Sequence, residues 1–471
     1  MEGVETGQLI GGFWTSTERR FSVINPYRRE VVAEVCQAGP DEVHAVLAAA
    51  SPPGQTPYER SEVLLRVRDR IAARDQDIIR VMVAESGFTV KDASGEVTRC
   101  LQTLTLCAEE AKRLAGDVVP FSGAPGGANR LGWTRLEPLG IVVAITPFNS
   151  PLNTVAHKVG PAFAAGNAVV LKPAEKTPLT AAMLCAAFVE AGAPAGSISL
   201  LQGKGSELGP ALLDDPRPAF YAFTGSTAVG RKIHAGAGLR KTQMELGSIA
   251  ATIVLSDADL DLAATAAAGA SFRKAGQVCT SIQLLIVERS IEGAFTERYL
   301  ERVAALSTGD PSDPDTDVGP VISPEAADRI TSWVDKAVAS GARALTGAGR
   351  QETLLAPTVL AGVDHTMDVA CREIFGPVTC VVGVADVDEA IDRVNATPYG
   401  LATGVFTNDI DRAQTCSERL DVGSVHINQT CSSRIDLMPY GGFKDSGFGH
   451  EGPHYAIREM TREKLVSFTF H

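Results

Sequence analysis

Residues 141–172 have the sequence IVVAITPFNSPLNTVAHKVGPAFAAGNAVVLK. The apolar run at 141–145 predicts a buried strand, and the helical pattern at 152–165 ends before a second apolar run at 168–171. A helix between two buried strands is typical of a parallel sheet with crossover connections. This stretch therefore predicts an α/β fold.

Strands and helices continue to alternate after this stretch. A helix at 179–191 precedes strands at 198–201 and 219–223, which predicts a doubly wound sheet over about 140–250. A second block with the same alternation covers about 250–440. Its strand candidates are residues 251–255, 284–287 and 378–382.

The composition indicates a large globular protein and excludes several classes of function. At about 150 residues per domain, 471 residues predict about three structural units. The formal net charge of −13 would repel a phosphate polyanion, which argues against nucleic-acid binding. No apolar stretch approaches the roughly 20 residues of a membrane span, and no secretory signal is visible. The nine cysteines form no C-x-x-C pair, so a reduced, cytoplasmic protein is expected.

The segment GFGHEG at 447–452 matches the G-x-G-x-x-G pattern of dinucleotide-binding loops. No apolar strand precedes it, and too few residues follow for a βαβ unit with its acidic ribose partner. We therefore expect a flexible glycine turn there. The eight histidines show no metal-ligand spacing, so no metal site is expected.

The first of four segments that together suggest chemistry is TPFNSP at 146–151. Pro147 and Pro151 stiffen the turn after the first strand, so Asn149 is held at a rigid corner. An amide at such a corner can donate a hydrogen bond to a developing oxyanion. The alternative is an asparagine that only caps the turn.

Two further segments lie at the carboxyl ends of predicted strands, where open α/β sheets bind ligands. Lys172 and Glu175, in KPAE, could hold the two hydroxyls of an adenosine ribose, or could form an ordinary surface ion pair. The segment FTGSTAVG at 223–230 predicts a strand, a Gly-Ser turn and a helix start. Such a turn can present backbone N–H groups to a pyrophosphate, although a simply capped helix has the same pattern.

The fourth segment has two parts, which supply a carboxylate and a thiol. MELGS at 244–248 contains Glu245, and FRKAGQVC at 272–279 ends in Cys279. Most cysteines are inert packing residues, but Cys279 follows a polar, flexible turn in which Gly276 permits close backbone approach. A thiolate nucleophile and a carboxylate base allow two-stage acyl chemistry.

In this order and at these spacings, the four segments resemble the aldehyde dehydrogenase superfamily, nearest its non-acylating lactaldehyde, phosphonoacetaldehyde and succinate-semialdehyde branches. The resemblance extends from Ile24-Asn25-Pro26 to the strand candidate at 465–468. Further matching motifs are EIFGPV at 373–378, NATPYGL at 395–401 and PYGG at 439–442. Two positions depart from the usual pattern, because Ser248 replaces a second glycine and Leu284 stands where many members have arginine.

The resemblance implies an α/β fold with two doubly wound parallel-sheet domains and a small β arm for oligomerisation. The NAD-binding domain would comprise 1–117 and 139–246, the catalytic domain 247–450, and the arm 118–138 and 451–471. The apolar strand at 465–468 would be exposed in a monomer, so a homodimer or homotetramer is expected.

The resemblance also implies a reaction, the oxidation of a small aldehyde to its carboxylic acid. Cys279 would attack the aldehyde carbon, and Asn149 with the Cys279 backbone N–H would stabilise the oxyanion of the thiohemiacetal. After hydride transfer to the nicotinamide leaves a thioester, Glu245 would activate the water that hydrolyses it. Lys158, on the helix after the corner, would lie near the proton pathway.

Contacts with the dinucleotide are implied in the same way. They are Ile145, Thr146, Pro147 and Phe148 at the first corner; Lys172 and Glu175 on the ribose; Gly205 and Gly209 at the adenine; Phe223, Gly225, Ser226 and Val229 in the Gly-Ser segment; Leu246 on the nicotinamide; and Glu373 and Phe375 on its ribose. Glu175 favours NAD over NADP, because a 2′-phosphate would bring about −1.5 to −2 charges against its carboxylate.

Three residues are candidates for binding the rest of the substrate: His157, which shares a helix face with Asn153, Arg273, which is six residues before Cys279, and Arg434. They predict a short aldehyde with an anionic tail, such as a semialdehyde or phosphonoacetaldehyde. The alternative substrate is a hydroxyaldehyde of the lactaldehyde or glyceraldehyde type. The competing interpretation is that the arginines form structural salt bridges and that His157 is a packed polar residue.

Two other classes of protein are alternatives. A thiol hydrolase would pair Cys279 with a histidine and would leave Lys172, Glu175 and Glu373 without a role. A non-catalytic structural protein on the same fold would not need Cys279 and Glu245, and both are present.

Overall fold

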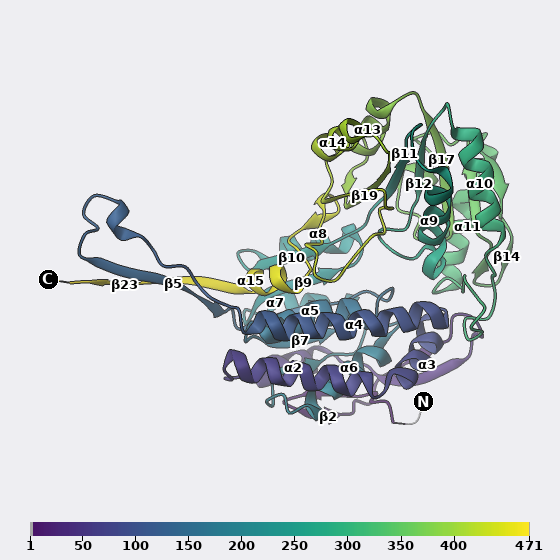
Figure 1. The fold of residues 1–471 in the computed structure, drawn as a ribbon. Coiled ribbons are helices and arrows are strands. Elements are labelled where there is room, and N and C mark those ends of the chain that lie inside the picture. The colour runs from purple at the N-terminus through teal and green to yellow at the C-terminus, as the bar shows by residue number, and fades with distance from the viewer. Residues whose placement is uncertain (1–2, 471) are drawn as a thin grey trace.

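The computed structural model describes residues 3–470 and contains two large, mostly parallel sheets and a long two-stranded ribbon (Figure 1). The first sheet has eight strands in the order β2-β1-β8-β7-β6-β9-β10-β22. Its five central strands are parallel, and antiparallel strands form both edges. The strands are β1 (Gln8–Ile10), β2 (Phe13–Thr15), β6 (Ile141–Ile145), β7 (Ala168–Lys172), β8 (Ile198–Leu200), β9 (Pro218–Thr224), β10 (Lys241–Glu245) and β22 (Gly447–Phe448).

Helices cover both faces of this sheet, which confirms the doubly wound arrangement predicted over about 140–250. Along β6, Val142 and Ala144 pack against α2 to α6, whereas Val143 packs on the opposite face against α1 and α7. This alternation explains why the strand is apolar on every residue. The helices are α1 (Pro40–Ala49), α2 (Pro57–Ala72), α3 (Asp75–Ser86), α4 (Val90–Ala111), α5 (Asn153–Ala164), α6 (Pro178–Glu190), α7 (Gly205–Asp214), α8 (Thr227–Ala237) and α15 (Pro453–Glu459).

The second sheet has seven strands in the order β13-β16-β17-β12-β11-β19-β20, and all pairs except β13–β16 are parallel. Its strands are β11 (Ala251–Val254), β12 (Leu284–Glu288), β13 (Arg343–Thr346), β16 (Thr358–Ala361), β17 (Val378–Val384), β19 (Ala402–Phe406) and β20 (Ser424–Ile427). Its helices are α9 (Leu260–Phe272), the short 3₁₀ helix η2 (Arg273–Gly276), α10 (Glu292–Ala304), α11 (Pro324–Ala339), α12 (Asp368–Cys371), α13 (Val387–Asn395) and α14 (Ile410–Arg419). One continuous apolar core belongs to this sheet and its helices.

The ribbon consists of β5 (Arg130–Pro138) and β23 (Thr461–Thr469), which pair antiparallel along their whole length. It projects away from both sheets, and the C-terminal end of the chain lies at its tip (Figure 1). Smaller elements are β3 (Arg20–Ile24) with β4 (Val31–Cys36), β14 (Arg350–Gln351) with β15 (Leu354–Leu355), β18 (Tyr399–Gly400) with β21 (Phe443–Lys444), and η1 (Phe121–Gly123).

The C-terminal part of the chain returns to the first sheet, which the sequence patterns did not indicate. The glycine-rich segment expected to be a flexible turn contains β22, which pairs antiparallel with the end of β10. Gly447 (φ +111°) lies so close to β10 that a Cβ there would be 1.8 Å from the Met244 carbonyl oxygen. The following helix α15 packs on α4 and α5 and leads into the ribbon strand β23. A two-residue edge strand has no hydrophobic periodicity, so no pattern could predict it.

Candidate active site

A cavity of about 120 Å³ lies where the two sheets meet. Its walls come from α4, the corner after β6, the ends of β9 and β10, the loop from η2 to Cys279, and the segment 432–451. The lining residues are Glu96, Arg99, Asn149, Ser150, Asn153, Thr154, Thr224, Glu245, Leu246, Arg273, Lys274, Val278, Cys279, Thr280, Ser432, Arg434, Tyr440 and Glu451. Segments far apart in the sequence therefore build one pocket around Cys279.

Cys279 is a partly exposed thiol in the wall of this pocket. Its sulfur lies 2.9 Å from the Tyr440 hydroxyl. Burial raises the pKa of the Cys279 thiol to about 11, with the Tyr440 hydrogen bond opposing the shift. The thiol is therefore protonated at neutral pH in this structure and must lose its proton before it can attack a carbonyl.

Asn149 is held at the corner after β6, as the two prolines predict. Its side-chain nitrogen donates to the Gln277 carbonyl oxygen at 2.9 Å, two residues before the thiol. A carboxamide carries two N–H donors, so the second is available to a developing oxyanion in the pocket. The structure thus brings the predicted amide and the predicted nucleophile to the same wall.

Glu245, the last residue of β10, is a buried carboxyl beside a second carboxyl, Glu451. Neither Glu245 oxygen has a hydrogen-bond partner within residues 3–470. Burial and the charge on Glu451 hold the pKa of Glu245 well above its usual value. Because no other group of the described residues occupies its oxygens, this carboxyl can accept a hydrogen bond from water once it is deprotonated.

Lys158, predicted to lie near the proton pathway, forms an ion pair with Glu451 rather than with Glu245. Its ammonium is 3.1 Å from one Glu451 oxygen, and the Arg434 guanidinium is 2.7 Å from the other. Although burial opposes the shift, these two cations hold the pKa of Glu451 well below its usual range. Glu451 therefore stays ionised and favours the protonated form of its neighbour Glu245.

The residues predicted to hold a dinucleotide gather along the carboxyl edge of the first sheet. Ile145 ends β6, and Thr146, Pro147 and Phe148 follow it. Lys172 ends β7, and Glu175 lies in the turn after it. Gly205 and Gly209 lie in the first turns of α7, and Phe223, Gly225, Ser226 and Val229 run from β9 into α8. The Lys172 ammonium is buried and donates to the Pro173 carbonyl oxygen, and burial lowers its pKa to about 8. Ser226 occupies the N-cap position of α8, where backbone N–H groups favour an anion.

Leu246, Glu373 and Phe375 complete this edge from the side of the Cys279 thiol. A Glu373 oxygen accepts from the Ser248 backbone N–H at 3.0 Å, and burial raises the Glu373 pKa to about 7. The Phe375 ring meets the Phe148 ring edge-on at 5.8 Å. An ordered strand edge, a buried cation and a helix N-terminus fit the diphosphate and riboses of a nicotinamide dinucleotide.

The two arginines predicted to bind substrate both line the pocket, but with different partners. The Arg434 guanidinium is already paired with Glu451 and lies over the Tyr440 ring at 3.8 Å. Arg273 donates to the Ser432 hydroxyl at 3.1 Å and has no carboxylate within ion-pair distance among residues 3–470. Arg273 is therefore the cation whose charge is left for a ligand.

His157 does not line the pocket, contrary to the prediction from helix spacing. Its ring is fully buried behind Asn153, 2.8 Å from an Asp436 oxygen and 3.3 Å from the Thr103 hydroxyl. Burial lowers the His157 pKa. Every residue of α5 is buried, so the helix packs against protein on all sides. His157 therefore shares a helix face with Asn153 without reaching the pocket.

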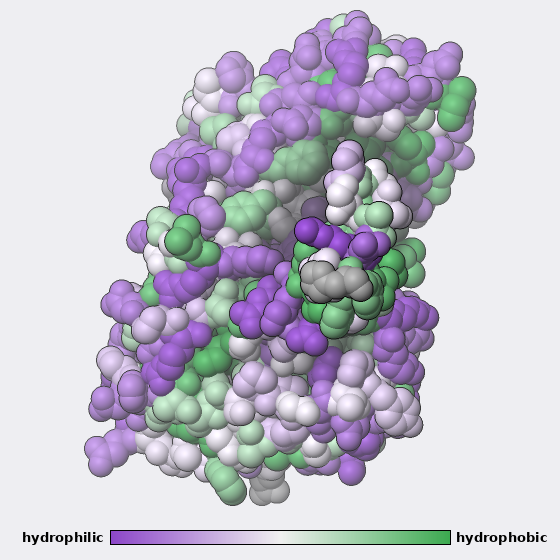
Figure 2. Space-filling view, turned by 90° about the vertical axis from the view of Figure 1, so that its left-hand side faces the viewer, coloured by the Kyte–Doolittle hydropathy of each residue, from purple (hydrophilic) through white to green (hydrophobic). Residues whose placement is uncertain are grey.

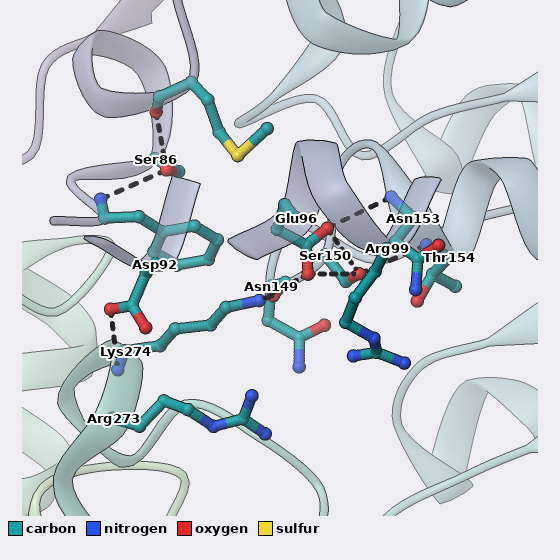
Figure 3. Close-up of polar contacts among 12 residues, drawn as sticks. Ser86, Asp92, Glu96, Arg99, Asn149, Ser150, Asn153, Thr154, Arg273 and Lys274 are labelled. Atoms are coloured by element: carbon teal, nitrogen blue, oxygen red, sulfur yellow. Dashed lines mark hydrogen bonds and ion pairs between the residues drawn. The ribbon is translucent and has the colours of Figure 1, made fainter. Parts of the chain in front are cut away.

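Sequence reasoning missed four residues that shape the pocket: Arg99, Tyr440, Glu451 and Lys274. Arg99, which comes from α4 and is labelled in Figure 3, forms a bidentate pair with Asp436, at 2.6 and 3.2 Å. Nothing in the helical pattern of α4 distinguishes this arginine from a surface residue. Glu451 lies in the segment GFGHEG, whose glycine spacing predicts a turn and gives no indication that the carboxylate reaches a pocket.

No histidine lies among the residues that line the pocket, and no group of three or more histidine, cysteine or acidic side chains within residues 3–470 could hold a metal ion. The absence of a histidine beside Cys279 argues against the thiol hydrolase alternative. A thiol, an amide donor and a buried carboxyl next to a dinucleotide-binding edge instead define an oxidoreductase that acts on an aldehyde group.

Comparison with known proteins identifies the family. The sequence model of the aldehyde dehydrogenase family matches residues 13–466, and the chain belongs to this family. It is 42% identical over 463 residues to 3-sulfolactaldehyde dehydrogenase of Priestia megaterium, covering 98% of this chain and 97% of the relative. It is 36% identical to lactaldehyde dehydrogenase of Methanocaldococcus jannaschii, covering 97% and 99%.

Solved structures confirm the fold. Aldehyde dehydrogenase 21 from Physcomitrella patens, in complex with the reaction product succinate, superimposes with a TM-score of 0.96 at 34% identity, covering 100% of this chain and 99% of the other. NADP-dependent glyceraldehyde-3-phosphate dehydrogenase from Bacillus halodurans, complexed with NADP, gives a TM-score of 0.96 at 34% identity and covers 99% of both chains.

Proposed function

We propose that this enzyme oxidises a small aldehyde with an anionic tail to its carboxylic acid, with NAD as the oxidant and Cys279 as the nucleophile. The observation that supports it is the shared pocket of Cys279, Asn149 and the unpaired Arg273 guanidinium. A thiol, an oxyanion donor and an anion anchor at one cavity suit an aldehyde whose other end carries a negative charge.

In this proposal the Cys279 thiol first releases its proton to water, and its sulfur then forms a bond to the aldehyde carbon. The electrons of the carbonyl π bond move to the oxygen, which accepts a hydrogen bond from the Asn149 amide. The resulting thiohemiacetal loses hydride and becomes a thioester on Cys279. Glu245 then removes a proton from a water molecule, whose oxygen attacks the thioester carbon and releases the acid and the thiol. Lys158 and Arg434 keep Glu451 ionised beside Glu245 throughout.

The dinucleotide would be held by the carboxyl edge of the first sheet, with Lys172 and Glu175 at one ribose and Glu373 at the other. When bound, its nicotinamide ring supplies the hydride acceptor. Among solved relatives, one is described as NAD-dependent and another is complexed with NADP, so the choice rests on this chain's own residues. We infer NAD, because the Glu175 carboxylate would repel a 2′-phosphate.

Glu175→Ala is expected to relax the preference for NAD. Removing the carboxylate deletes both a hydroxyl acceptor and a repulsive charge, so the ratio of kcat/KM for NAD to that for NADP should fall by about 10-fold or more. Steady-state rates with both cofactors measure it. Glu190→Ala, at the end of α6, is the matched control and should leave the ratio unchanged. An unchanged ratio in Glu175→Ala would contradict the proposed selectivity.

Arg273 is the residue proposed to bind the anionic tail of the substrate, because the other pocket-lining cations already have carboxylate partners. Arg99 forms an ion pair with Asp436, Lys274 with Glu96, and Arg434 with Glu451, which Lys158 also contacts. Among the described residues that line the cavity, Arg273 is the one arginine or lysine without a carboxylate within ion-pair distance, and the nearby Glu245 favours its neutral form. A carboxylate or sulfonate would supply the missing charge and accept from the guanidinium and the Ser432 and Thr280 hydroxyls.

Arg273→Leu tests this anchor. It is expected to raise KM for a carboxylated or sulfonated aldehyde by about 10- to 100-fold, because hydrogen bonds to charged groups are worth about 1.5–3 kcal/mol. KM for propanal, which has no anion to anchor, should change by less than about twofold. The wild-type enzyme is first assayed with carboxylated, sulfonated, phosphonylated and hydroxylated aldehydes. Equal effects on anionic and neutral aldehydes would remove the anion site from the proposal.

A hydroxyaldehyde is the second candidate substrate. The hydroxyls of Thr280 and Ser432 lie 3.4 Å apart in the pocket wall and could accept from or donate to a substrate hydroxyl. The similarity to lactaldehyde dehydrogenases is consistent with it. In the same assay, a lactaldehyde rate unaffected by Arg273→Leu and above that of every anionic aldehyde would favour this candidate.

We further propose that the ribbon of β5 and β23 forms part of a homodimer or homotetramer interface. Figure 2 views the molecule along the ribbon, whose tip presents a cluster of apolar residues to the viewer. Along the ribbon and its end, Leu131, Trp133, Leu465, Phe468 and Phe470 are exposed. Exposed apolar strands of this kind are normally covered by another chain.

Within residues 3–470 no helix is long and apolar enough to cross a bilayer, and a cytoplasmic location is our proposal.

A further inference from the structure

The loop that carries Cys279 begins with an unusual turn. Lys274 and Ala275 both have φ of +53°, and Gly276 has φ of +70°, so three successive residues are left-handed. This conformation is unfavourable for residues with a Cβ, and it persists only where the surroundings hold it. Gly276 is pressed against the Gly376 carbonyl oxygen, which a Cβ would approach to 2.1 Å. The turn therefore needs a specific restraint on its Lys274 end as well.

The side chain of Lys274 supplies that restraint. Its ammonium is buried, donates to a Glu96 oxygen at 2.8 Å and to the Asn149 carbonyl oxygen at 2.9 Å, and lies 4.6 Å from the centre of the Phe88 ring. Its backbone N–H donates to an Asp92 oxygen, one turn before Glu96 on α4. Figure 3 shows the side chain running from the turn to the Asn149 corner.

Glu96 holds the same corner from the other side. Its carboxylate accepts from the Ser150 hydroxyl at 2.8 Å and from the Asn153 backbone N–H at 3.0 Å. The oxyanion donor and the nucleophile's loop are therefore both tied to one buried ion pair between Lys274 and Glu96. Neither residue is needed to balance the charge of the cavity, because the two charges cancel each other.

We propose that Lys274 is a positioning residue that sets the distance between the Asn149 amide and the Cys279 sulfur. Its ammonium fixes the Asn149 main chain while its backbone forms the turn that places the nucleophile. An oxyanion donor must lie within a few tenths of an ångström of its place, and a misplacement of about 1 Å can cost about 10²-fold in rate. This inference rests on the proposed chemistry of Cys279 and Asn149.

The test compares Lys274→Met with the double variant Lys274→Met/Glu96→Gln. The single variant leaves Glu96 buried without its counter-charge, so it is expected to lower Tm. The double variant removes both charges, and the introduced amide would keep an oxygen for Ser150 and Asn153, so Tm should recover. The readout is the rate of the first-turnover burst of NADH, which reports thiohemiacetal formation and hydride loss. We expect this rate to stay about 10²-fold below wild type in the double variant, with KM for NAD unchanged.

A double-mutant cycle with Asn149→Ala separates positioning from a general structural effect. If Lys274 acts through Asn149, adding Lys274→Met/Glu96→Gln to Asn149→Ala should slow the burst no further. Lys91→Met, the same substitution at an exposed lysine paired with Asp317, is the control and should keep the wild-type burst. A burst restored together with Tm in the double variant, or fully additive effects in the cycle, would overturn the proposal. A wild-type enzyme that forms no NADH with any aldehyde would instead overturn the proposed function.

Discussion

Cys279→Ser is expected to lower kcat for aldehyde oxidation by about 10⁴-fold or more. Replacing a nucleophile that forms a covalent intermediate removes the route itself rather than one stabilising contact. A serine hydroxyl is a far weaker acid than the thiol, whose pKa burial already raises to about 11, so the pocket could not ionise it. NADH absorbance under saturating aldehyde measures the loss.

Two controls show that the loss concerns chemistry. NAD binding, followed by quenching of tryptophan fluorescence, should be unchanged because the dinucleotide edge of the first sheet is intact. Mass spectrometry of wild-type enzyme quenched during turnover should find the acyl group on the peptide that contains Cys279. Turnover that survives in Cys279→Ser, or an acyl group on another cysteine, would refute the assignment of the nucleophile.

Glu245→Gln should separate the two halves of the reaction. The amide cannot remove a proton from water, so steady-state kcat should fall by about 10²- to 10⁴-fold. The first turnover does not need the hydrolytic base, and one equivalent of NADH per active site should still form. The acyl-enzyme should then accumulate and be visible as a mass increase. Loss of the burst together with the steady state would show that Glu245 instead serves the first step.

The pH dependence of hydrolysis follows from the same carboxyl. Glu245 is a base only when it is deprotonated, and its pKa is held above the ordinary value of 4.5 by burial and by Glu451. Lowering the pH should therefore slow hydrolysis at a higher pH than a solvent-exposed glutamate would give. In Glu245→Gln the residual hydrolysis should lose this decline. Rapid-quench measurement of thioester decay at several pH values checks the direction.

The parts of the fold that rest on hydrophobic periodicity could be predicted from the sequence. Ile141–Ile145 is a strand with the predicted bounds, and α5 and β7 follow it as expected. The strand β22 could not be predicted, because its two residues carry no periodicity and are fixed by close approach to β10. Local pattern determines the regular elements, whereas edge strands depend on contacts between distant segments.

In the candidate site, too, some residues could be predicted from local motifs and others only from contacts between distant segments. Cys279, Asn149 and Glu245 lie in motifs with turn-forming neighbours, and the structure places all three in one cavity. His157 was misplaced because helix spacing gives a face but not its burial. Arg99 and Lys274 have no local signal, since their roles depend on where α4 meets the corner at Asn149. Partners from distant helices can be identified only once the chain is folded.

The distribution of cysteines has a practical consequence. Of the nine, seven are buried, and Cys279 and Cys371 alone are partly exposed. Replacing Cys371 by serine would leave the pocket sulfur as the one thiol that a maleimide dye could reach in the folded protein. The amount of dye bound at completion would then count the pocket thiols that are accessible in the folded preparation.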